Sequence, residues 1–400
     1  MTADNLISGF VKPQFESVKD VFIENFEQRN ELGAACCIYY QGDKVVDLWG
    51  GIKNEATGEP WEEDTMVLVW STTKGLSALA MALANSQGLF EYDKPVSKYW
   101  PEFAQNGKER ITVRQLMAHQ AGLYAFDELG DREIITDLDR LAVVLAKQKP
   151  AYEPGARHVY HALTLGFYQS ELLRRVDPKG RSLGQFFQDE IATPLGIDFY
   201  IGLPDDIPNS KLAPLREVKF SFSAMKSAGL GMILSAMNPR SPLRRALVGT
   251  EFCLDDDRIY TRNYEVPSGG GIGTARAIAR AYSVFATGGK ELGIREETLQ
   301  QLMAPAIPPT RGLKDGAFKM NTSYSLGFAK GLPESPFGSP SSFGMPGTGG
   351  SFGYADPEVG IGYGYVLNGL GTSFPHDPRD IALRTEFYRV IGRSDLLVGK

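Results

Sequence analysis

The first part of the chain changes from a helical to a strand-like hydrophobic pattern. Residues 13–28 repeat apolar side chains at helical spacing, which predicts an amphipathic helix. Two runs rich in β-branched and aromatic residues follow at 34–40 and 44–49, and residues 41–43 (Gln-Gly-Asp) between them are typical of a hairpin turn. We therefore expect a pair of antiparallel strands directly after the first helix.

The middle of the chain carries mostly helical patterns and loops. An apolar run at 75–84 predicts a buried helix that begins near Ser71. Residues 111–119 predict a short helix, which Thr112 can cap and which stops at 120–123. Strand-like patterns return near the C-terminus, ahead of one last helical segment; we expect strands at 322–328, 351–355 and 360–367, a turn at 356–358 and a helix at 377–391.

Strands at both ends with helices between them predict a mixed α/β (α+β) fold. In such a fold both termini build one antiparallel sheet and a mainly helical lobe is inserted between them. With 400 residues, 42% of them hydrophobic, the chain can bury a large core. We expect a single domain over 1–400, with an α/β lobe at about 1–65 and 275–400 and a helical lobe at about 66–274.

Charge and composition exclude several classes of function. The net charge is −6 and no dense run of Lys or Arg occurs, which argues against nucleic-acid partners and against anionic membrane surfaces. No apolar run reaches membrane-spanning length, so we expect no membrane partner. Small neutral or cationic ligands stay open, and the oligomeric state cannot be read from the sequence.

Cysteine and histidine usage points to a chain without disulfides or metal. Two of the three cysteines, Cys36 and Cys37, are adjacent, and three cysteines cannot form a disulfide framework. The first ten residues lack a basic segment followed by an unbroken apolar one, so we expect no secretory signal and a cytoplasmic location. The four histidines lack metal-ligand spacing, and we expect no metal and no cofactor.

The most informative stretch is Ser71-Thr72-Thr73-Lys74 at the start of a predicted helix. Three positions apart on a helix, Ser71 and Lys74 share a face, so the amine can take the proton of the hydroxyl. Burial and the positive helix end both favour a neutral amine. The alternative is a capping serine followed by a surface lysine. A second Ser-x-x-Lys, Ser223 to Lys226, lies in a serine-rich stretch close to Gly229, and we interpret it as a chance match.

Two later segments can complete this chemistry. Tyr160 precedes a helical pattern, and its phenol has an ordinary pKa close to that of a lysine amine, so beside Lys74 it could pass protons. Taken alone, a tyrosine is more often a residue at the edge of the core. Residues 344–351 (Gly-Met-Pro-Gly-Thr-Gly-Gly-Ser) precede a strand, where one backbone N–H could pair with that of Ser71 to hold an oxyanion; a plain turn is the alternative.

Together these motifs resemble the serine β-lactamase and penicillin-binding-protein superfamily, and most of all its class C-like branch, which includes the family VIII carboxylesterases. Tyr160 follows Ser71 at a distance comparable to the interval in that branch. The similarity covers nearly the whole chain and rests on these segments: the Ser71 helix, 93–96, 99–103, 111–123, the Tyr160 segment, 269–276 and 344–351.

The resemblance implies a β-lactamase-like fold and a role for each matching residue. Ser71 would be the acyl-accepting nucleophile, Lys74 its base and Tyr160 a proton relay, and the amides of Ser71 and Thr348 would donate to the oxyanion. The same comparison draws attention to the motif positions that face the substrate. We expect Met345, Gly347 and His161 to contact it.

Two departures from the family motifs favour esters over lactams. The Tyr-x-Asn motif of β-lactamases reads Tyr160-His161-Ala162, which lacks the amide that helps to bind a lactam side chain. The Lys-Thr-Gly motif reads Met345-Pro346-Gly347, which lacks its cation.

The resemblance and these departures together predict a serine carboxylesterase that acts on small-molecule esters through an acyl-enzyme, with transfer of the acyl group to an acceptor as a variant of the same reaction. The first alternative is a β-lactamase or D-alanyl-D-alanine peptidase. The second is a non-catalytic relative that uses the same cleft for binding.

Overall fold

The computed structural model describes residues 7–126, 133–216, 230–248, 250–373 and 375–399. Its largest feature is an antiparallel sheet of nine strands, eight of them in the order β1-β3-β2-β14-β13-β12-β11-β10, with β4 paired to β3. The strands are β1 (Ile7–Val11), β2 (Gly33–Tyr40), β3 (Asp43–Asn54), β4 (Glu59–Pro60), β10 (Tyr324–Ser325), β11 (Phe328–Ala329), β12 (Phe343–Pro346), β13 (Phe352–Asp356) and β14 (Ile361–Leu367).

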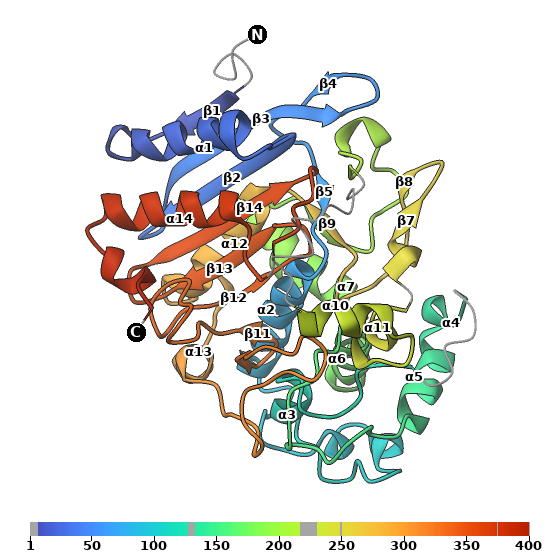
Figure 1. Ribbon diagram of the computed structural model, residues 1–400. Helices are drawn as coiled ribbons and strands as arrows, with labels where there is room; N and C mark the ends of the chain where they lie inside the picture. Colours follow the sequence, from blue (N-terminus) through green and yellow to red (C-terminus); the bar gives the residue numbers. More distant parts are fainter. Residues whose placement is uncertain (1–6, 127–132, 217–229, 249, 374, 400) are drawn as a thin grey trace.

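The two termini meet in the middle of this sheet, where β14 pairs with β2 along seven residue pairs. Helices α1 (Glu16–Gln28) and α14 (Pro378–Val390) lie side by side over one face (Figure 1). Helix α12 (Ala275–Ala286) packs against β14, β2 and β13 on the other face. The predicted sheet built from both termini and the mixed fold class are thereby confirmed.

The sequence of β14 explains how both faces are filled. Its glycines and tyrosines alternate, so that one residue type faces each side. A Cβ on Gly364 would lie 2.3 Å from the Ala275 carbonyl oxygen, so only glycine lets α12 approach this closely. Tyr363 and Tyr365 on the opposite face are buried in the cluster that includes Phe387 of α14. The alternation therefore lets α12 pack closely on one face of the sheet and places a layer of aromatic side chains on the other face.

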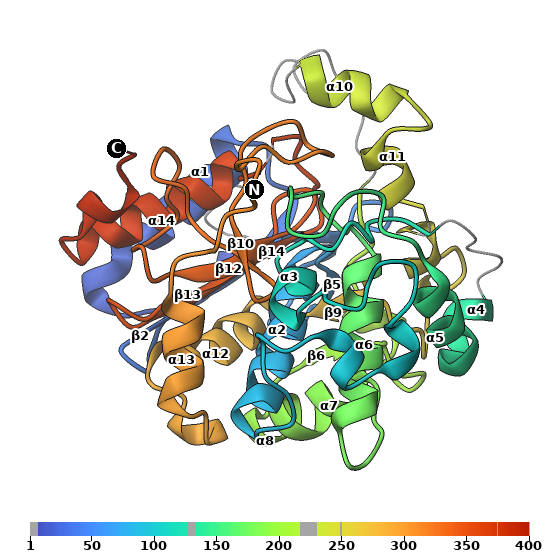
Figure 2. The ribbon, with the colours of Figure 1, turned by 90° about the horizontal axis from the view of Figure 1, so that it is seen from below.

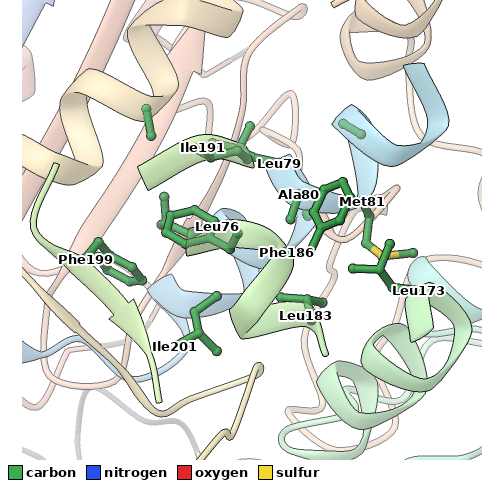
Figure 3. Packing of buried hydrophobic residues seen from close by; sticks show 14 of the residues in the cluster. Leu76, Leu79, Ala80, Met81, Leu173, Leu183, Phe186, Ile191, Phe199 and Ile201 are labelled. Atoms are coloured by element: carbon green, nitrogen blue, oxygen red, sulfur yellow. The ribbon is translucent and has the colours of Figure 1, made fainter. Parts of the chain in front are cut away.

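The remaining elements surround α2 (Thr72–Ser86), whose residues are all buried. Figure 3 shows Leu76, Leu79 and Met81 of this helix packed against Leu183 and Phe186. A small sheet, β5-β9-β6, leads into α2, and β7 pairs with β8. These strands are β5 (Val67–Leu68), β6 (Phe199–Ile201), β7 (Leu254–Asp255), β8 (Ile259–Tyr260) and β9 (Gly271–Gly273).

The other helices are mostly short, and α10 and α11 project from the body of the molecule (Figure 2). The helices are α3 (Val113–Met117), α4 (Glu133–Thr136), α5 (Leu138–Lys147), α6 (Thr164–Val176), α7 (Leu183–Phe187), α8 (Thr193–Leu195), α10 (Leu230–Met237), α11 (Pro242–Ala246) and α13 (Glu296–Met303). Turns of 3-10 helix cover Pro13–Phe15, Val96–Lys98, Pro101–Phe103, Asn209–Lys211, Thr250–Cys253, Lys290–Leu292 and Ser394–Leu397, and a π turn covers Gln188–Ala192.

Local predictions agree with the structure at most elements and fail at one. Thr112 caps α3, as the sequence predicted, and the structure adds a capping box with Gln115. The single strand predicted at 322–328 is wrong, because β10 and β11 form a hairpin there. Its two turn residues, Leu326 and Gly327, have φ of 53° and 93°. Glycine adopts this conformation readily, whereas leucine rarely does, so the strand-like pattern concealed the turn.

Candidate active site

Ser71 lies at the first turn of α2, directly after a bend in the backbone. Trp70 before it has a φ of 46°, in the left-handed region that large side chains rarely adopt. Ser71 occupies the N-cap position, yet its side chain makes no capping hydrogen bond. The structure therefore does not support the alternative of a capping serine. The side chain is partly exposed and faces a cavity.

Lys74 is wholly buried, one helical turn from Ser71. Its Nζ lies 2.6 Å from the Ala162 carbonyl oxygen, 2.7 Å from the Ser268 carbonyl oxygen and 3.2 Å from Ser71 Oγ. Burial lowers the pKa of the Lys74 amine well below its usual value, because a charged ammonium loses its hydration there. Lys74 is therefore not the surface lysine of the alternative interpretation.

A neutral amine fits this environment atom for atom. It has two N–H groups and one lone pair, and the two backbone carbonyls accept both N–H groups. The lone pair then faces the Ser71 hydroxyl, whose proton it can accept. The arrangement can thus activate Ser71 as a nucleophile.

Tyr160 closes the other side of the Ser71 hydroxyl. Its ring centroid is 4.7 Å from Lys74 Nζ, and its side chain is hydrogen-bonded to that of Ser71. Burial raises the pKa of the Tyr160 phenol, so the hydroxyl stays protonated and can donate a proton. The ring is held between His119 at 4.7 Å and Phe318 at 5.0 Å, centroid to centroid.

The segment 346–351, named here the glycine loop, runs beside the start of α2. Ser351 Oγ donates to the Val69 carbonyl at 2.8 Å and lies 3.0 Å from Thr72 Oγ1. A Cβ on Gly347 would lie 2.3 Å from the Val69 carbonyl oxygen, so a side chain there would push the loop away from α2. Glycine at this position keeps the loop in contact with the backbone next to Ser71.

Ser71 and Thr348 reach the same cavity from these two segments. Within the part of the chain that the structure describes, no hydrogen-bond acceptor is found for the backbone N–H of either residue. Two such N–H groups can stabilise the oxyanion of a tetrahedral intermediate.

The cavity has a volume of about 300 Å³ and a mainly apolar wall. The wall comes from α11, from the loop before β10 and from the edge of the large sheet. Its apolar members include Leu163, Leu243, Ala246, Ala317, Phe318, Met320, Leu332, Met345 and Pro346. A small ligand with an apolar body fits such a surface best.

Two residues of this wall, Met345 and Lys330, determine whether it offers a cation to a ligand. Met345, on β12, is buried and occupies the position where the family motif has a cation. Lys330 also lines the cavity, but its Nζ donates to the carbonyls of Leu302 and Met303 at the end of α13. Burial lowers the pKa of Lys330 to about 8. Its ammonium is thus engaged by the protein and points toward the helix end.

His161 does not join the cavity wall. Its ring is completely buried, with Nδ1 2.7 Å from the Val159 carbonyl oxygen and Nε2 accepting the Leu123 N–H at 3.1 Å. Burial lowers its pKa to about 3. The expected substrate contact of His161 is therefore not part of the site that the structure assembles, since both ring nitrogens are committed to the backbone.

The structure brings together most of the residues expected from the sequence. Ser71, Tyr160, Met345, Gly347 and Thr348 all line the cavity, and Lys74 lies directly behind Ser71. The second motif, Ser223 to Lys226, lies outside the described residues.

Two supporting residues, Ser351 and Asp315, were not expected from the sequence. Ser351 is the last residue of the glycine loop, and its hydroxyl became informative only once Val69 was placed beside it. Asp315 is buried in the wall behind Tyr160, where its carboxylate accepts the N–H groups of Ala317 and Phe318. Burial raises its pKa to about 6. Ser351 closes the 344–351 motif, which predicts no role for it, and no motif or spacing in the sequence marks Asp315.

The described residues meet the requirements of neither a metal site nor a membrane-spanning helix. Over the described residues, no group of three or more His, Cys, Asp or Glu side chains is placed to hold a metal ion. None of the helices described has the length and apolar content needed to cross a bilayer.

Comparisons with known proteins find similarity over most of the chain. The family model described as "Beta-lactamase" matches residues 18–386. The chain is 31% identical over 390 residues to the Esterase/beta-lactamase LipL of Mycobacterium tuberculosis, a match that covers 92% of this chain and 84% of LipL.

Two solved structures are similar over almost their whole length. A family VIII carboxylesterase superposes with a TM-score of 0.83 at 33% identity, covering 96% of this chain and 99% of that one. A penicillin-binding protein homolog from Caulobacter crescentus superposes with a TM-score of 0.80 at 31% identity and covers the same shares. The relatives thus include proteins named for ester, lactam and penicillin chemistry.

Proposed function

Because the chain belongs to the beta-lactamase family, we propose that it is a serine carboxylesterase that forms an acyl-enzyme on Ser71. Its relatives support a serine hydrolase of this superfamily. One observation carries the finer proposal: the buried Lys74 Nζ lies within hydrogen-bond distance of two backbone carbonyls and of Ser71 Oγ, so in its neutral form its lone pair can accept the Ser71 proton. A module that only binds would have no use for this arrangement.

The first half of the reaction forms the acyl-enzyme. Ser71 Oγ attacks the ester carbonyl carbon while its proton moves to Lys74 Nζ. The N–H groups of Ser71 and Thr348 donate to the oxyanion that develops on the carbonyl oxygen. When the intermediate collapses, the bond to the alkoxy oxygen breaks and Tyr160 gives that oxygen a proton. Tyr160 regains its proton from Lys74, which is then neutral again.

The second half releases the acid. A water molecule takes the place of the departed alcohol, and the same groups accept its proton as its oxygen attacks the acyl carbon. The Ser71 ester bond then breaks and Ser71 recovers its hydrogen. An alcohol in place of water would make the same step an acyl transfer, which we propose as a second outcome at the same site.

Esters are favoured over lactams because of Met345. A lactam carries a carboxylate, and a thioether offers it no hydrogen-bond donor. The nearby Lys330 does not replace the missing cation, since its amine donates to carbonyls at the end of α13. β-Lactam or D-alanyl-peptide hydrolysis stays the alternative, favoured by the family and by the names of its relatives.

The test compares Ser71→Ala with Ser223→Ala on a short-chain nitrophenyl ester and on a chromogenic cephalosporin. We expect Ser71→Ala to reduce ester turnover to background and Ser223→Ala to leave it nearly intact. A fluorophosphonate probe should label Ser71 alone. Cephalosporin turnover equal to or faster than ester turnover would replace the esterase proposal with the alternative. The cytoplasmic location expected from the sequence stays a prediction, which cell fractionation would check.

A further inference from the structure

The glycine loop has an anchor on the side away from α2 as well. Gly349 has a φ of 87° and Gly350 a φ of 119°, both in the region that favours glycine. Because glycine has no side chain that restricts the backbone, neither residue fixes the conformation of the loop by itself. The Gly371 N–H donates to the Gly349 carbonyl at 2.7 Å. A Cβ on Gly350 would lie 2.9 Å from Cβ of Asp377, so this side of the loop packs tightly against the start of α14. The conformation of the glycine loop therefore depends on the residues that pack against this side of it.

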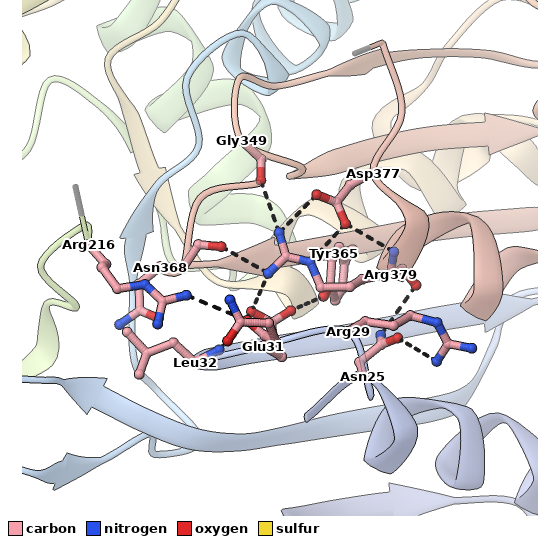
Figure 4. A network of polar contacts seen from close by, with 12 residues as sticks. Asn25, Arg29, Glu31, Leu32, Arg216, Gly349, Tyr365, Asn368, Asp377 and Arg379 are labelled. Carbon is pink, nitrogen blue, oxygen red and sulfur yellow. Dashed lines mark hydrogen bonds and ion pairs between the residues drawn. The ribbon is translucent and has the colours of Figure 1, made fainter. Parts of the chain in front are cut away.

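Arg379 makes the central polar contacts on this side of the glycine loop (Figure 4). It is 4% exposed, and all three guanidinium nitrogens have partners. Nη1 donates to Glu31 at 2.8 Å and to the Gly369 carbonyl at 2.9 Å, while Nε and Nη2 donate to Asp377 at 2.8 and 2.9 Å. Nη2 also donates to the Gly349 carbonyl at 3.4 Å. One side chain thus joins the glycine loop, the segment after β14 and the start of α14.

The acidic partners fix the guanidinium in turn. Glu31 lies before β2, is buried, and accepts a hydrogen bond from the Tyr365 hydroxyl of β14. Asp377 is the N-cap of α14 and accepts the backbone N–H of Arg379. Because a guanidinium is a planar fork with five donors, these two carboxylates determine its orientation and not only its place.

We propose that Arg379 is a positioning residue for catalysis, which holds the Gly349 carbonyl so that the neighbouring Thr348 N–H stays directed at the oxyanion. This inference rests on the proposed function and extends it to a residue that lines no part of the catalytic cavity. The loop is then fixed from two sides, by Ser351 at α2 and by Arg379 at α14.

The expected effect follows from how strictly an oxyanion donor must be placed. Loss of one donor costs about 10²- to 10³-fold in kcat, and a misplacement of about 1 Å costs about 10²-fold. Arg379→Lys keeps a positive charge beside Glu31 and Asp377, but one ammonium cannot reach both carboxylates and both carbonyls. We expect kcat for an ester to fall about 10- to 100-fold with little change in KM.

The decisive measurement is the ratio of kcat for a nitrophenyl ester to kcat for its thionoester. Sulfur accepts hydrogen bonds weakly, so a thionoester depends much less on the oxyanion donors. Arg379→Lys should therefore lower the ester rate strongly and the thionoester rate little. Arg384→Lys is the matched control, since Arg384 lies on the same helix, is 3% exposed and pairs with the buried Asp380. Its ester-to-thionoester ratio should equal that of the wild type.

Glu31→Gln is a second variant that loosens Arg379 without changing it, and it should shift the ratio in the same direction by a smaller factor. Ester and thionoester rates that fall equally in Arg379→Lys and Glu31→Gln would overturn the inference, as would unchanged kcat with only a loss of thermal stability. If the wild type shows no ester turnover that depends on Ser71, the proposed function fails and this inference with it. If turnover depends on Ser71 but the ester-to-thionoester ratio of Arg379→Lys equals that of the wild type, only this inference fails.

Discussion

His161 should make the protein less stable in acid by a predictable amount. Its Nδ1–H donates to the Val159 carbonyl and its Nε2 accepts the Leu123 N–H, so the buried ring is neutral with the proton on Nδ1. A proton added to Nε2 would face an N–H group in place of an acceptor. Burial, which removes the hydration of a charged ring, holds the folded-state pKa at about 3, whereas the unfolded chain has the ordinary value of 6.5.

The direction and size of the effect follow from this difference in pKa. Between pH 6.5 and about 3 the unfolded chain binds a proton that the folded protein refuses, so folding becomes less favourable as the pH falls. Each pH unit in this window is worth about 1.4 kcal/mol. Lowering the pH from 7.5 to 5.0 should therefore remove about 2 kcal/mol of stability through His161 alone.

The assay is urea unfolding at pH 7.5 and pH 5.0, followed by tryptophan fluorescence, for the wild type and His161→Asn. Asparagine cannot satisfy the Leu123 N–H as the ring does, so the variant is less stable at both pH values, but it carries no titrating group. His119, His158 and Asp315 also have pKa values shifted by burial, but they are present in both proteins, so their own titrations cancel in the comparison. The wild type should lose about 2 kcal/mol more than the variant on acidification. Equal losses would show that the His161 ring is not held neutral.

Three further outcomes test the site itself. Lys74→Met should reduce ester turnover nearly as far as Ser71→Ala. Because burial lowers the Lys74 pKa well below 10.5, kcat/KM of the wild type should stay high at neutral pH and fall on acidification. A rate that rises only near pH 10 would contradict a neutral amine. Tyr160→Phe keeps the ring between His119 and Phe318 and should lower kcat by about 10²- to 10⁴-fold, whereas an almost unchanged kcat would reduce Tyr160 to packing. Met345→Lys should raise kcat/KM for a cephalosporin by about ten- to a hundredfold, since a hydrogen bond to a carboxylate contributes about 1.5–3 kcal/mol; no gain would locate lactam discrimination elsewhere in the cavity.

Spacing and hydrophobic pattern alone could predict local features, whereas Tyr160 and Thr348 were expected at the site only through the family resemblance. Ser71 and Lys74 are three residues apart on one helix, and Thr112 with Gln115 forms a capping box, so in each case spacing alone determines the contact. The strands from both termini were predictable because their alternating pattern extends over several residues. Where a turn depends on one residue with unusual backbone angles, as at Leu326, the same pattern gave a wrong strand.

The contacts that complete the site join distant segments and leave no local signal. The carbonyl of Ser268, which takes one N–H of Lys74, lies 194 positions further along the chain, and Ser351 lies 282 positions from Val69. A backbone carbonyl carries no residue identity, so no motif could have marked it. At His161 the sequence predicted a contact that the fold does not make. Its place beside Tyr160 suggested a substrate contact, whereas its ring points into the protein.

The position of Gly75 shows how α2 and the sheet can meet so closely. A Cβ at this residue would lie 1.9 Å from the Tyr282 hydroxyl of α12 and 3.3 Å from Cβ of Met345 on β12. Glycine one residue after Lys74 therefore lets β12 lie directly against the first turn of α2, and the glycine loop that follows β12 reaches Ser71 as a consequence. The two N–H groups proposed for the oxyanion come from segments that meet through this contact and through the hydrogen bonds of Ser351. Their spacing is accordingly a property of how α2 packs on the sheet, with Ser351 fastening the loop in front and Arg379 fastening it behind.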